Sequence, residues 1–167
     1  MIVFNTNYGS FTVELDLKKA PKTTANFIKY IEAGFYDGTI FHRVIDNFMI
    51  QGGGFEAGMM EKPNEESIEN EANNGLSNVL GTLAMARTSE PHSATSQFFI
   101  NVSDNLFLDH KNNSNQGWGY AVFGRIIDGM GTINRIKACE TRSSAGHQDV
   151  PVEDIVIESV SLDDKDT

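Results

Sequence analysis

The chain has 167 residues, a mass of 18.4 kDa and a formal net charge of −10, with hydrophobic residues at 40% and charged residues at 22%. These values are typical of a folded globular protein and argue against global disorder. The length predicts one domain over residues 1–167. The acidic balance argues against a nucleic-acid backbone or an anionic membrane as the main partner.

Cys139 is the only cysteine, which excludes an internal disulfide framework and a multi-cysteine zinc site and fits a reducing compartment. The start of the chain, Met1 to Thr6, lacks the basic residues and long apolar stretch of a signal peptide. No apolar run approaches the roughly 20 residues of a membrane span. We therefore expect a cytoplasmic monomer that binds neither membranes nor nucleic acid.

Residues 10–17 alternate strictly between apolar and polar side chains, which predicts a half-buried strand. Its buried face should carry Phe11, Val13, Leu15 and Leu17. The turn signal Asn7-Tyr8-Gly9 predicts that residues 2–5 pair with this strand as a hairpin. Further apolar or β-branched runs predict strands over 40–45, 48–51, 80–86, 97–102, 121–127 and 154–162.

Two segments have helical signals. Pro21 stands at a first helical position and Gly34 at a C-terminal cap, with an apolar stripe between them. Asp128 is expected to cap a shorter helix that carries Met130, Ile133 and Ile136. About eight strands and two helices that do not alternate predict a mainly-β fold. The expected architecture is a closed eight-stranded antiparallel β-barrel capped by two α-helices.

The remaining segments lack a periodic pattern. The polar stretches 61–78 and 103–119 are expected to be long loops that carry function or lie on the surface. The glycines at 52, 53, 54 and 58 follow neither a dinucleotide-binding nor a P-loop spacing. They are expected to form a sharp turn at the rim of the barrel.

An arginine and a glutamine interrupt the otherwise apolar run 41–54. Arg43 and Gln51 flank the Asp46-Asn47 turn signal, and Phe48 and Met49 lie between them in sequence. Strands on both sides of the turn would hold a cation and an amide donor beside a small apolar wall. This combination suits a neutral, partly apolar group that needs a hydrogen bond at one point.

The same theme recurs in residues 96–101, where an amide again stands beside aromatic residues. Strand alternation puts Gln97 and Phe99 on the face opposite Phe98. Met85, Phe98 and Ile100 are expected in the core. The aromatic residues from 107 to 123 fit either the core or a pocket wall, and composition does not separate the two.

Other chemistries have weaker support. None of the four histidines forms a two-histidine helical pair with a nearby carboxylate, so no metal site is expected. A serine hydrolase could use Ser93 or Ser96 with His92, but the nucleophile-elbow motif Gly-x-Ser-x-Gly is missing from the sequence.

Four sequence blocks in this order resemble the cyclophilin family. They are Phe41-His42-Arg43-Val44-Ile45, Phe48-Met49-Ile50-Gln51-Gly52-Gly53, Gly81-Thr82-Leu83-Ala84-Met85-Ala86 and Ser96-Gln97-Phe98-Phe99-Ile100. The likeness runs from near residue 1 to about residue 162, and the segments 70–76 and 117–124 resemble the bacterial cytoplasmic branch. The resemblance implies a peptidyl-prolyl cis–trans isomerase with the barrel described above and without a cofactor.

Matching the family motif residue by residue implies a site. Arg43 corresponds to the catalytic arginine, and Gln51 is expected to hold that arginine or the substrate carbonyl. The expected substrate-binding residues are Phe48, Met49, Ala86, Arg87, Thr88, Gln97, Phe99, Phe107, Leu108 and Tyr120. Of these, the segment 86–88 corresponds to the strand edge that lies along the bound peptide.

The implied partners are proline-containing peptides and unfolded or folding proteins. Phe107 stands where many members carry tryptophan, and Tyr120 where many carry histidine. Because phenylalanine lacks the indole N–H donor, cyclosporin-type cyclic peptides should bind only weakly. The alternative function is a non-catalytic module that recognises proline segments as a chaperone or scaffold, although pure binding does not require Arg43.

Overall fold

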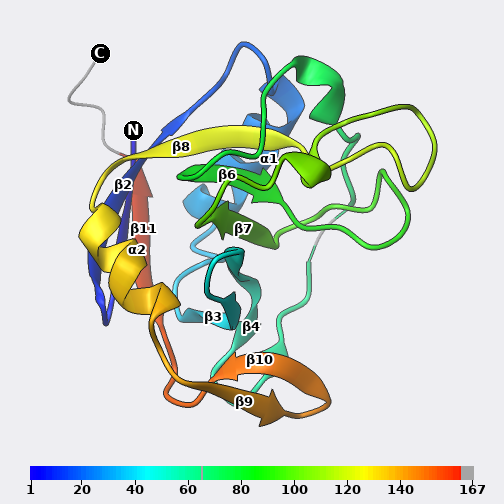
Figure 1. Cartoon of the computed structure of the whole chain (residues 1–167). Helices are drawn as coiled ribbons and strands as arrows, with labels where there is room; N and C mark the ends of the chain where they lie inside the picture. The colour runs from blue at the N-terminus through cyan, green and yellow to red at the C-terminus, as the bar shows by residue number, and fades with distance from the viewer. Residues whose placement is uncertain (65, 163–167) are drawn as a thin grey trace.

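The computed structural model describes residues 1–64 and 66–162. Its main sheet curls into a barrel in which antiparallel strands follow the order β11-β1-β2-β8-β6-β7-β4-β3 (Figure 1). These strands are β1 (Ile2–Thr6), β2 (Gly9–Leu15), β3 (Thr39–Ile45), β4 (Met49–Glu56), β6 (Thr82–Met85), β7 (Phe98–Asn101), β8 (Val122–Asp128) and β11 (Ile157–Leu162). A two-residue strand, β5 (Met60–Glu61), extends the sheet beside β4.

The barrel is nearly closed by a short seam between β3 and the residues that lead into β11. The amide of Phe41 donates to the carbonyl of Ile155 at 2.9 Å, and that of Gly38 donates to Ile157 at 2.8 Å. An isolated bridge between Ile40 and Val156 lies between these bonds. The predicted eight-stranded antiparallel barrel with two helices is confirmed.

The first helix, α1 (Pro21–Glu32), begins at its proline as predicted, and Gly34 follows it with a φ of 69°. The second helix, α2 (Met130–Lys137), begins differently from the prediction. Asp128 does not cap it, because Asp128 is still paired with Thr12 across β8 and β2. The chain turns at Gly129, whose φ of 90° favours glycine.

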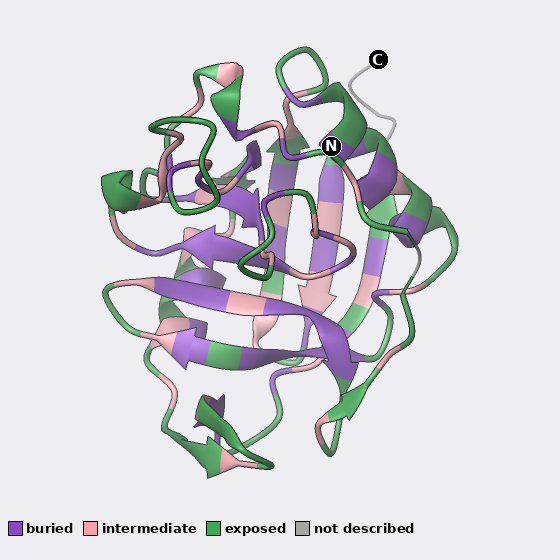
Figure 2. Cartoon of the chain, turned by 90° about the vertical axis from the view of Figure 1, so that its right-hand side faces the viewer, coloured by how far each residue is buried: buried purple, intermediate pink, exposed green. Residues whose placement is uncertain are grey.

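Aromatic residues fill the barrel interior. The rings of Phe4 and Phe11 stack at 4.7 Å, and Phe27 of α1 contacts Phe98 at 5.4 Å. Figure 2 shows the result, with most buried residues on the strands and most exposed residues on the loops. The prediction for Leu17 is wrong: its side chain is 60% exposed because β2 ends at Leu15.

The glycine-rich segment is not a rim turn, which corrects the prediction. Residues 52–54 lie inside β4, and only Gly58 lies in a turn. Gly53 has a φ of 87°, and the pairing register of β3 with β4 shifts twice between Thr39 and Arg43. Glycines at such irregularities let a strand bulge and bend where side chains would clash.

Sequence patterns missed a polar hairpin formed by β9 (Thr141–Ser144) and β10 (His147–Pro151). It turns through Ala145 and Gly146, both with positive φ, and it lies at the bottom of Figure 1. The predicted loops also contain 3₁₀ turns, at Ala72–Asn74 and at Leu106–Leu108. Within the described residues, no helix is long and apolar enough to cross a membrane.

Candidate active site

The outer face of the barrel carries a second apolar cluster. Along β4 and β7, Ile50 and Ile100 point into the barrel core, whereas their neighbours Met49 and Phe99 belong to the outer cluster. This confirms that Phe98 and Phe99 lie on opposite faces of β7. The outer cluster consists of Met49, Ala84, Phe99 and Val122, with Ile45, Phe48, Leu76, Ala86, Leu108 and Tyr120 packed against it.

A pocket of about 150 Å³ opens over this cluster. It is lined by Arg43, Phe48, Met49, Gln51, Ala86, Arg87, Phe99, Leu108 and Tyr120. A dry cavity of similar volume in another protein admits benzene, so a five-membered ring is a suitable size for this pocket. The structure therefore brings together nine of the twelve residues expected from the sequence.

Arg43 stands at the mouth of the pocket, where β3 pairs with β4. It is directly opposite Gln51 in register, and its Nη1 donates to Gln51 Oε1 at 3.4 Å. Gln51 Nε2 in turn donates to Gln97 Oε1 at 2.9 Å. The three side chains form a chain of hydrogen bonds that ends in a permanently charged, planar donor.

Gly54 makes room for Gln97, a role that sequence reasoning missed. A Cβ atom at Gly54 would meet the Gln97 side chain, with Cδ and Nε2 at 2.6 Å and Cγ closer still. The signal was present in the sequence, because a glycine inside a strand often marks the close approach of another group.

Arg87 connects the pocket wall to the loop around residues 115–120. Its guanidinium lies 4.7 Å from the ring centre of Tyr120, and its Nε donates to the carbonyl of Gly119 at 3.0 Å. Its Nη2 donates to the carbonyl of Asn115 at 3.2 Å. These contacts hold the pocket wall and the loop side by side at the right of Figure 1.

Thr88, Gln97 and Phe107 do not line the pocket itself. Gln97 reaches it through Gln51, and Thr88 lines a neighbouring hollow together with Gln97. Phe107 is 60% exposed and stacks on the outer side of Phe48 at 5.8 Å.

His42, next to Arg43 in β3, is a further residue that sequence reasoning did not assign to this region. It is 4% exposed, and its Nδ1 has no hydrogen-bond partner among the described residues. Burial lowers the pKa of His42 to about 4, and His147 and Arg43 add to this effect. The imidazole is therefore neutral at pH 7 and packs on Phe55, with 4.5 Å between ring centres.

The geometry gives no support to a serine hydrolase. The Ser93 hydroxyl donates to the carbonyl of Glu90, and His92 Nδ1 accepts the amide of Asn70. Ser96 Oγ is buried without a hydrogen-bond partner among the described residues. Across residues 1–64 and 66–162, no group of three histidine, cysteine, aspartate or glutamate side chains is arranged to hold a metal ion.

Comparison with known proteins identifies the family. Residues 1–162 match the model of the family described as "Cyclophilin type peptidyl-prolyl cis-trans isomerase/CLD". Peptidyl-prolyl cis-trans isomerase B of Escherichia coli is 57% identical, over 97% of this chain and 99% of that protein. Peptidyl-prolyl cis-trans isomerase cyp18 of Streptomyces antibioticus is 55% identical, over 96% and 97% of the two chains.

Solved structures agree with the sequence match. The crystal structure of a cyclophilin type peptidyl-prolyl cis-trans isomerase from Cryptosporidium parvum, obtained in the presence of the dipeptide Ala-Pro, superposes with a TM-score of 0.81. It is 31% identical to this chain, and the match covers 98% of this chain and 99% of that one. Fold and sequence thus define a prolyl isomerase. The chain belongs to the cyclophilin type of peptidyl-prolyl cis–trans isomerases.

Proposed function

We propose that this chain, as one domain over residues 1–167, accelerates rotation about X–Pro bonds in protein substrates and that Arg43 is the catalytic donor. One observation carries the assignment. The Arg43 guanidinium lines the same small pocket as Phe48, Met49 and Phe99, and Gln51 accepts a hydrogen bond from it. The apolar pocket has the size to hold a proline ring, and the guanidinium can donate a hydrogen bond to the ring nitrogen.

The chemistry of the twisted amide explains why an arginine suits this reaction. Rotation about the bond faces a barrier of roughly 18–20 kcal/mol, because the amide nitrogen shares its lone pair with the carbonyl. Halfway through the rotation, this conjugation is broken and the nitrogen carries a free lone pair. A donor aimed at that nitrogen therefore stabilises the twisted state more than either planar isomer.

The apolar wall and the arginine contribute at different stages. Burying a proline ring against Phe48, Met49, Phe99 and Leu108 is worth about 1.5–3 kcal/mol, by analogy with other apolar side chains. Both isomers bury the ring, so this term strengthens binding and barely lowers the barrier. An acceleration of about 10⁴-fold needs about 5.5 kcal/mol that is specific to the twisted state. One preorganised donor supplies roughly 3–4 kcal/mol of it.

The residues around the donor have supporting roles in this mechanism. Gln51 and Gln97 orient the guanidinium through their chain of hydrogen bonds. The edge formed by residues 86–88 holds the peptide so that only one side of the bond turns, and Arg87 keeps Tyr120 against the pocket. Phe107 extends the wall beyond Phe48. The rest of the stabilisation comes from an environment that favours the less polar, twisted amide.

The substrates that fit this site are proline-containing segments of unfolded or folding proteins. The reaction makes and breaks no covalent bond, so it requires no cofactor or metal. A net charge of −10 disfavours both self-association and nucleic-acid binding, so we infer a monomer. The single cysteine fits a reducing compartment, and we infer the cytoplasm. Cyclosporin-type cyclic peptides should bind weakly, since Phe107 offers no N–H donor.

The test is Arg43→Ala with an Ala-Pro peptide followed by NMR exchange spectroscopy. We expect isomerisation to slow by at least about 10²-fold while peptide affinity stays within a few-fold, because the donor acts mainly on the twisted state. Arg125→Ala, which changes an exposed arginine of β8, serves as the control. Normal turnover in the Arg43 variant would remove the catalytic assignment of Arg43, because the isomerase would then work without that donor.

A further inference from the structure

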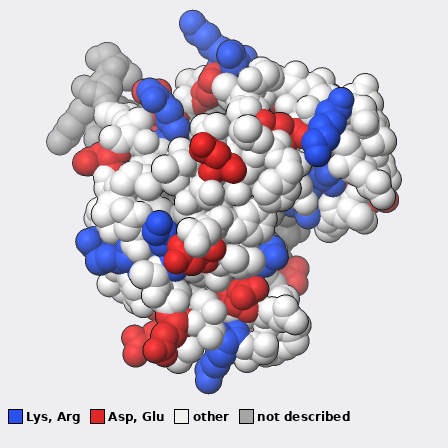
Figure 3. Space-filling model, in the orientation of Figure 1, with Lys and Arg blue, Asp and Glu red and all other residues white. Residues whose placement is uncertain are grey.

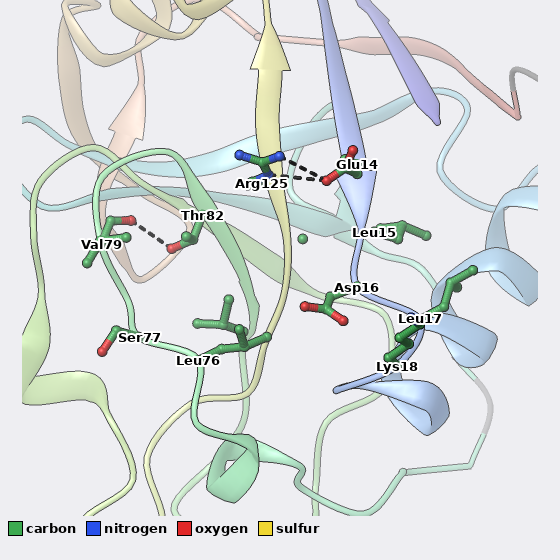
Figure 4. A pocket seen from close by; sticks show the side chains of 12 residues that line it. Glu14, Leu15, Asp16, Leu17, Lys18, Leu76, Ser77, Val79, Thr82 and Arg125 are labelled. Carbon is green, nitrogen blue, oxygen red and sulfur yellow. Dashed lines mark hydrogen bonds and ion pairs between the residues drawn. The ribbon is translucent and has the colours of Figure 1, made fainter. Parts of the chain in front are cut away.

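A second hollow, larger than the proline pocket, lies where β2 and β8 face the segment 76–79. Its volume is about 520 Å³, and Figure 4 shows the side chains that line it. It is lined by Glu14, Leu15, Asp16, Leu17, Lys18, Leu76, Ser77, Val79, Thr82, Val122, Gly124 and Arg125. None of these residues lines the proline pocket, so the assigned activity does not explain the hollow.

The lining leaves apolar side chains in contact with water. Leu17 is 60% exposed and Val79 is 38% exposed, and they come from opposite sides of the hollow in Figure 4. Leu15 and Leu76, which also line the hollow, are half-buried. A single exposed leucine has little meaning, but several around one hollow mark an interaction site.

The charges of the lining indicate what kind of side chain fits. Glu14 and Arg125 pair with each other at 3.1 Å, so they largely cancel. Asp16 is half-buried, and in Figure 4 its carboxylate points toward the hollow between Leu76 and Leu17. Its Oδ1 accepts the amide of Lys19. A carboxylate inside an apolar hollow favours a cationic neighbour, whereas Lys18 is exposed to solvent at the rim.

The charge of the whole molecule favours the same kind of partner. Lys and Arg are interspersed with Asp and Glu on the face shown in Figure 3, but the net charge is −10. Two copies of this chain therefore repel each other, while a basic segment is attracted. This argues for a different protein as the occupant of the hollow and against a second copy.

The hollow also shares a wall with the proline pocket. Leu76 and Val122 line the hollow and pack in the same outer cluster as Met49 and Phe99. Ser77, another lining residue, donates to Asp109 of the loop that follows Leu108. A segment bound in the hollow would thus contact Leu76 and Val122 of the outer cluster and leave the residues that line the proline pocket uncovered.

We propose that this hollow, which we call the Leu17 groove, docks a partner-protein segment that carries a leucine-sized apolar side chain next to a lysine or arginine. The apolar side chain packs on Leu17, Leu76 and Val79, and the cation pairs with Asp16. Binding requires no proline, so the groove lets the protein hold a partner while the proline pocket remains free to work.

A proline-free, fluorescein-labelled peptide with a Leu-Lys pair tests the proposal by anisotropy and by amide chemical shifts of the groove residues. We expect saturable binding below about 1 mM. Leu17→Ser and Asp16→Asn should each weaken it by about tenfold, because they remove the apolar contact and the charge. Leu162→Ser, at a 41% exposed leucine of β11, should change nothing.

Two further measurements distinguish binding in the Leu17 groove from activity at the proline pocket. Leu17→Ser should leave isomerisation of an Ala-Pro peptide unchanged, and Arg43→Ala should leave binding of the Leu-Lys peptide unchanged. Equal binding by a Leu-Glu peptide, or shifts confined to the proline pocket, would overturn the proposal. So would sedimentation that reveals a dimer lost in Leu17→Ser, because the occupant would then be a second copy.

Discussion

The Arg43 guanidinium is hydrogen-bonded to a neutral amide, Gln51, and to no carboxylate of the described residues. A carboxylate partner would neutralise much of its positive potential. An amide partner fixes its direction and leaves that potential available to an incoming lone pair. Glutamine rather than glutamate at position 51 therefore keeps the positive charge of Arg43 available to the substrate in the proposed mechanism.

A substitution at Gly54 tests whether the orientation of the Arg43 guanidinium matters for catalysis. In Gly54→Ala, the new methyl group would displace the Gln97 side chain and break its bond to Gln51. Loss of one orienting hydrogen bond should slow isomerisation by about tenfold with little change in stability. The measurement is kcat/KM by NMR exchange. Gly131→Ala is the matched control, because its nearest contact would be at 3.7 Å. Equal activity in the two variants would contradict the positioning role.

Phe107 offers a test of inhibitor recognition. Phe107→Trp adds an indole N–H on the outer side of Phe48, and cyclosporin inhibition should strengthen by up to about tenfold, the value of one hydrogen bond. The readout is the inhibitor concentration that halves isomerisation. Leu106→Trp places the same ring on the neighbouring, 57% exposed position and should have no effect. The explanation fails if the two variants respond alike.

Among the elements, the loops behind the pocket are held by a buried network of amides. Asn101 in β7 donates to Asn78 and to Thr82, both at 3.0 Å. Asn105 donates to the carbonyl of Phe48 and to Asn101, both at 2.8 Å. The network ties Asn105, at the start of the 103–119 loop, to Asn101 of β7 and to Phe48 of the pocket wall. The start of the loop is therefore held in place beside the site.

Removing the centre of this network should loosen the whole region. In Asn101→Ala, the buried Asn78 oxygen and the Asn105 amide each lose a partner, at about 1–3 kcal/mol for an unsatisfied group. We expect the free energy of unfolding in urea to fall by about 3 kcal/mol, with faster hydrogen exchange in the 103–119 loop. Asn134→Ala on the exposed face of α2 should change neither quantity.

Elements with a clear chemical signal were predictable from the sequence, and those without one were not. Pro21 and Gly34 fix the ends of α1, and alternation fixes which face of β7 carries Phe99. The β9–β10 hairpin was missed because most of its side chains are polar and exposed, and only Val150 and Pro151 at its end are buried. The site residues were expected from a family motif, but their contacts depend on strand pairing. Nothing local brings Gln97 to Gln51, 46 positions away.

At the scale of the whole molecule, stability should depend on pH through His42. The unfolded imidazole takes a proton near its ordinary pKa of 6.5, whereas the buried one does so only near 4. Between these values the unfolded state binds more protons, so the free energy of unfolding falls as the pH drops from about 6.5 to 4. The contribution of this group is about 3 kcal/mol.

Urea unfolding of His42→Phe over pH 4 to 7 measures this contribution. Phenylalanine keeps a ring beside Phe55 and cannot be protonated, so the decline in stability toward low pH should shrink. His92→Gln, at an exposed histidine, should keep the decline of the unaltered protein. An identical decline in all three proteins would mean that other groups control the acid sensitivity.

The seam between β3 and β11 has a consequence for biosynthesis. The first strand, β1, pairs with the last described strand, β11, and the contacts that seal the barrel come from residues 155–157. While translation is in progress, the pocket-bearing strands emerge from the ribosome well before the segment that completes the core beneath them. A nascent copy therefore reaches its working shape only once synthesis has passed residue 162, and ribosome stalling before that point would leave its aromatic interior exposed to chaperones.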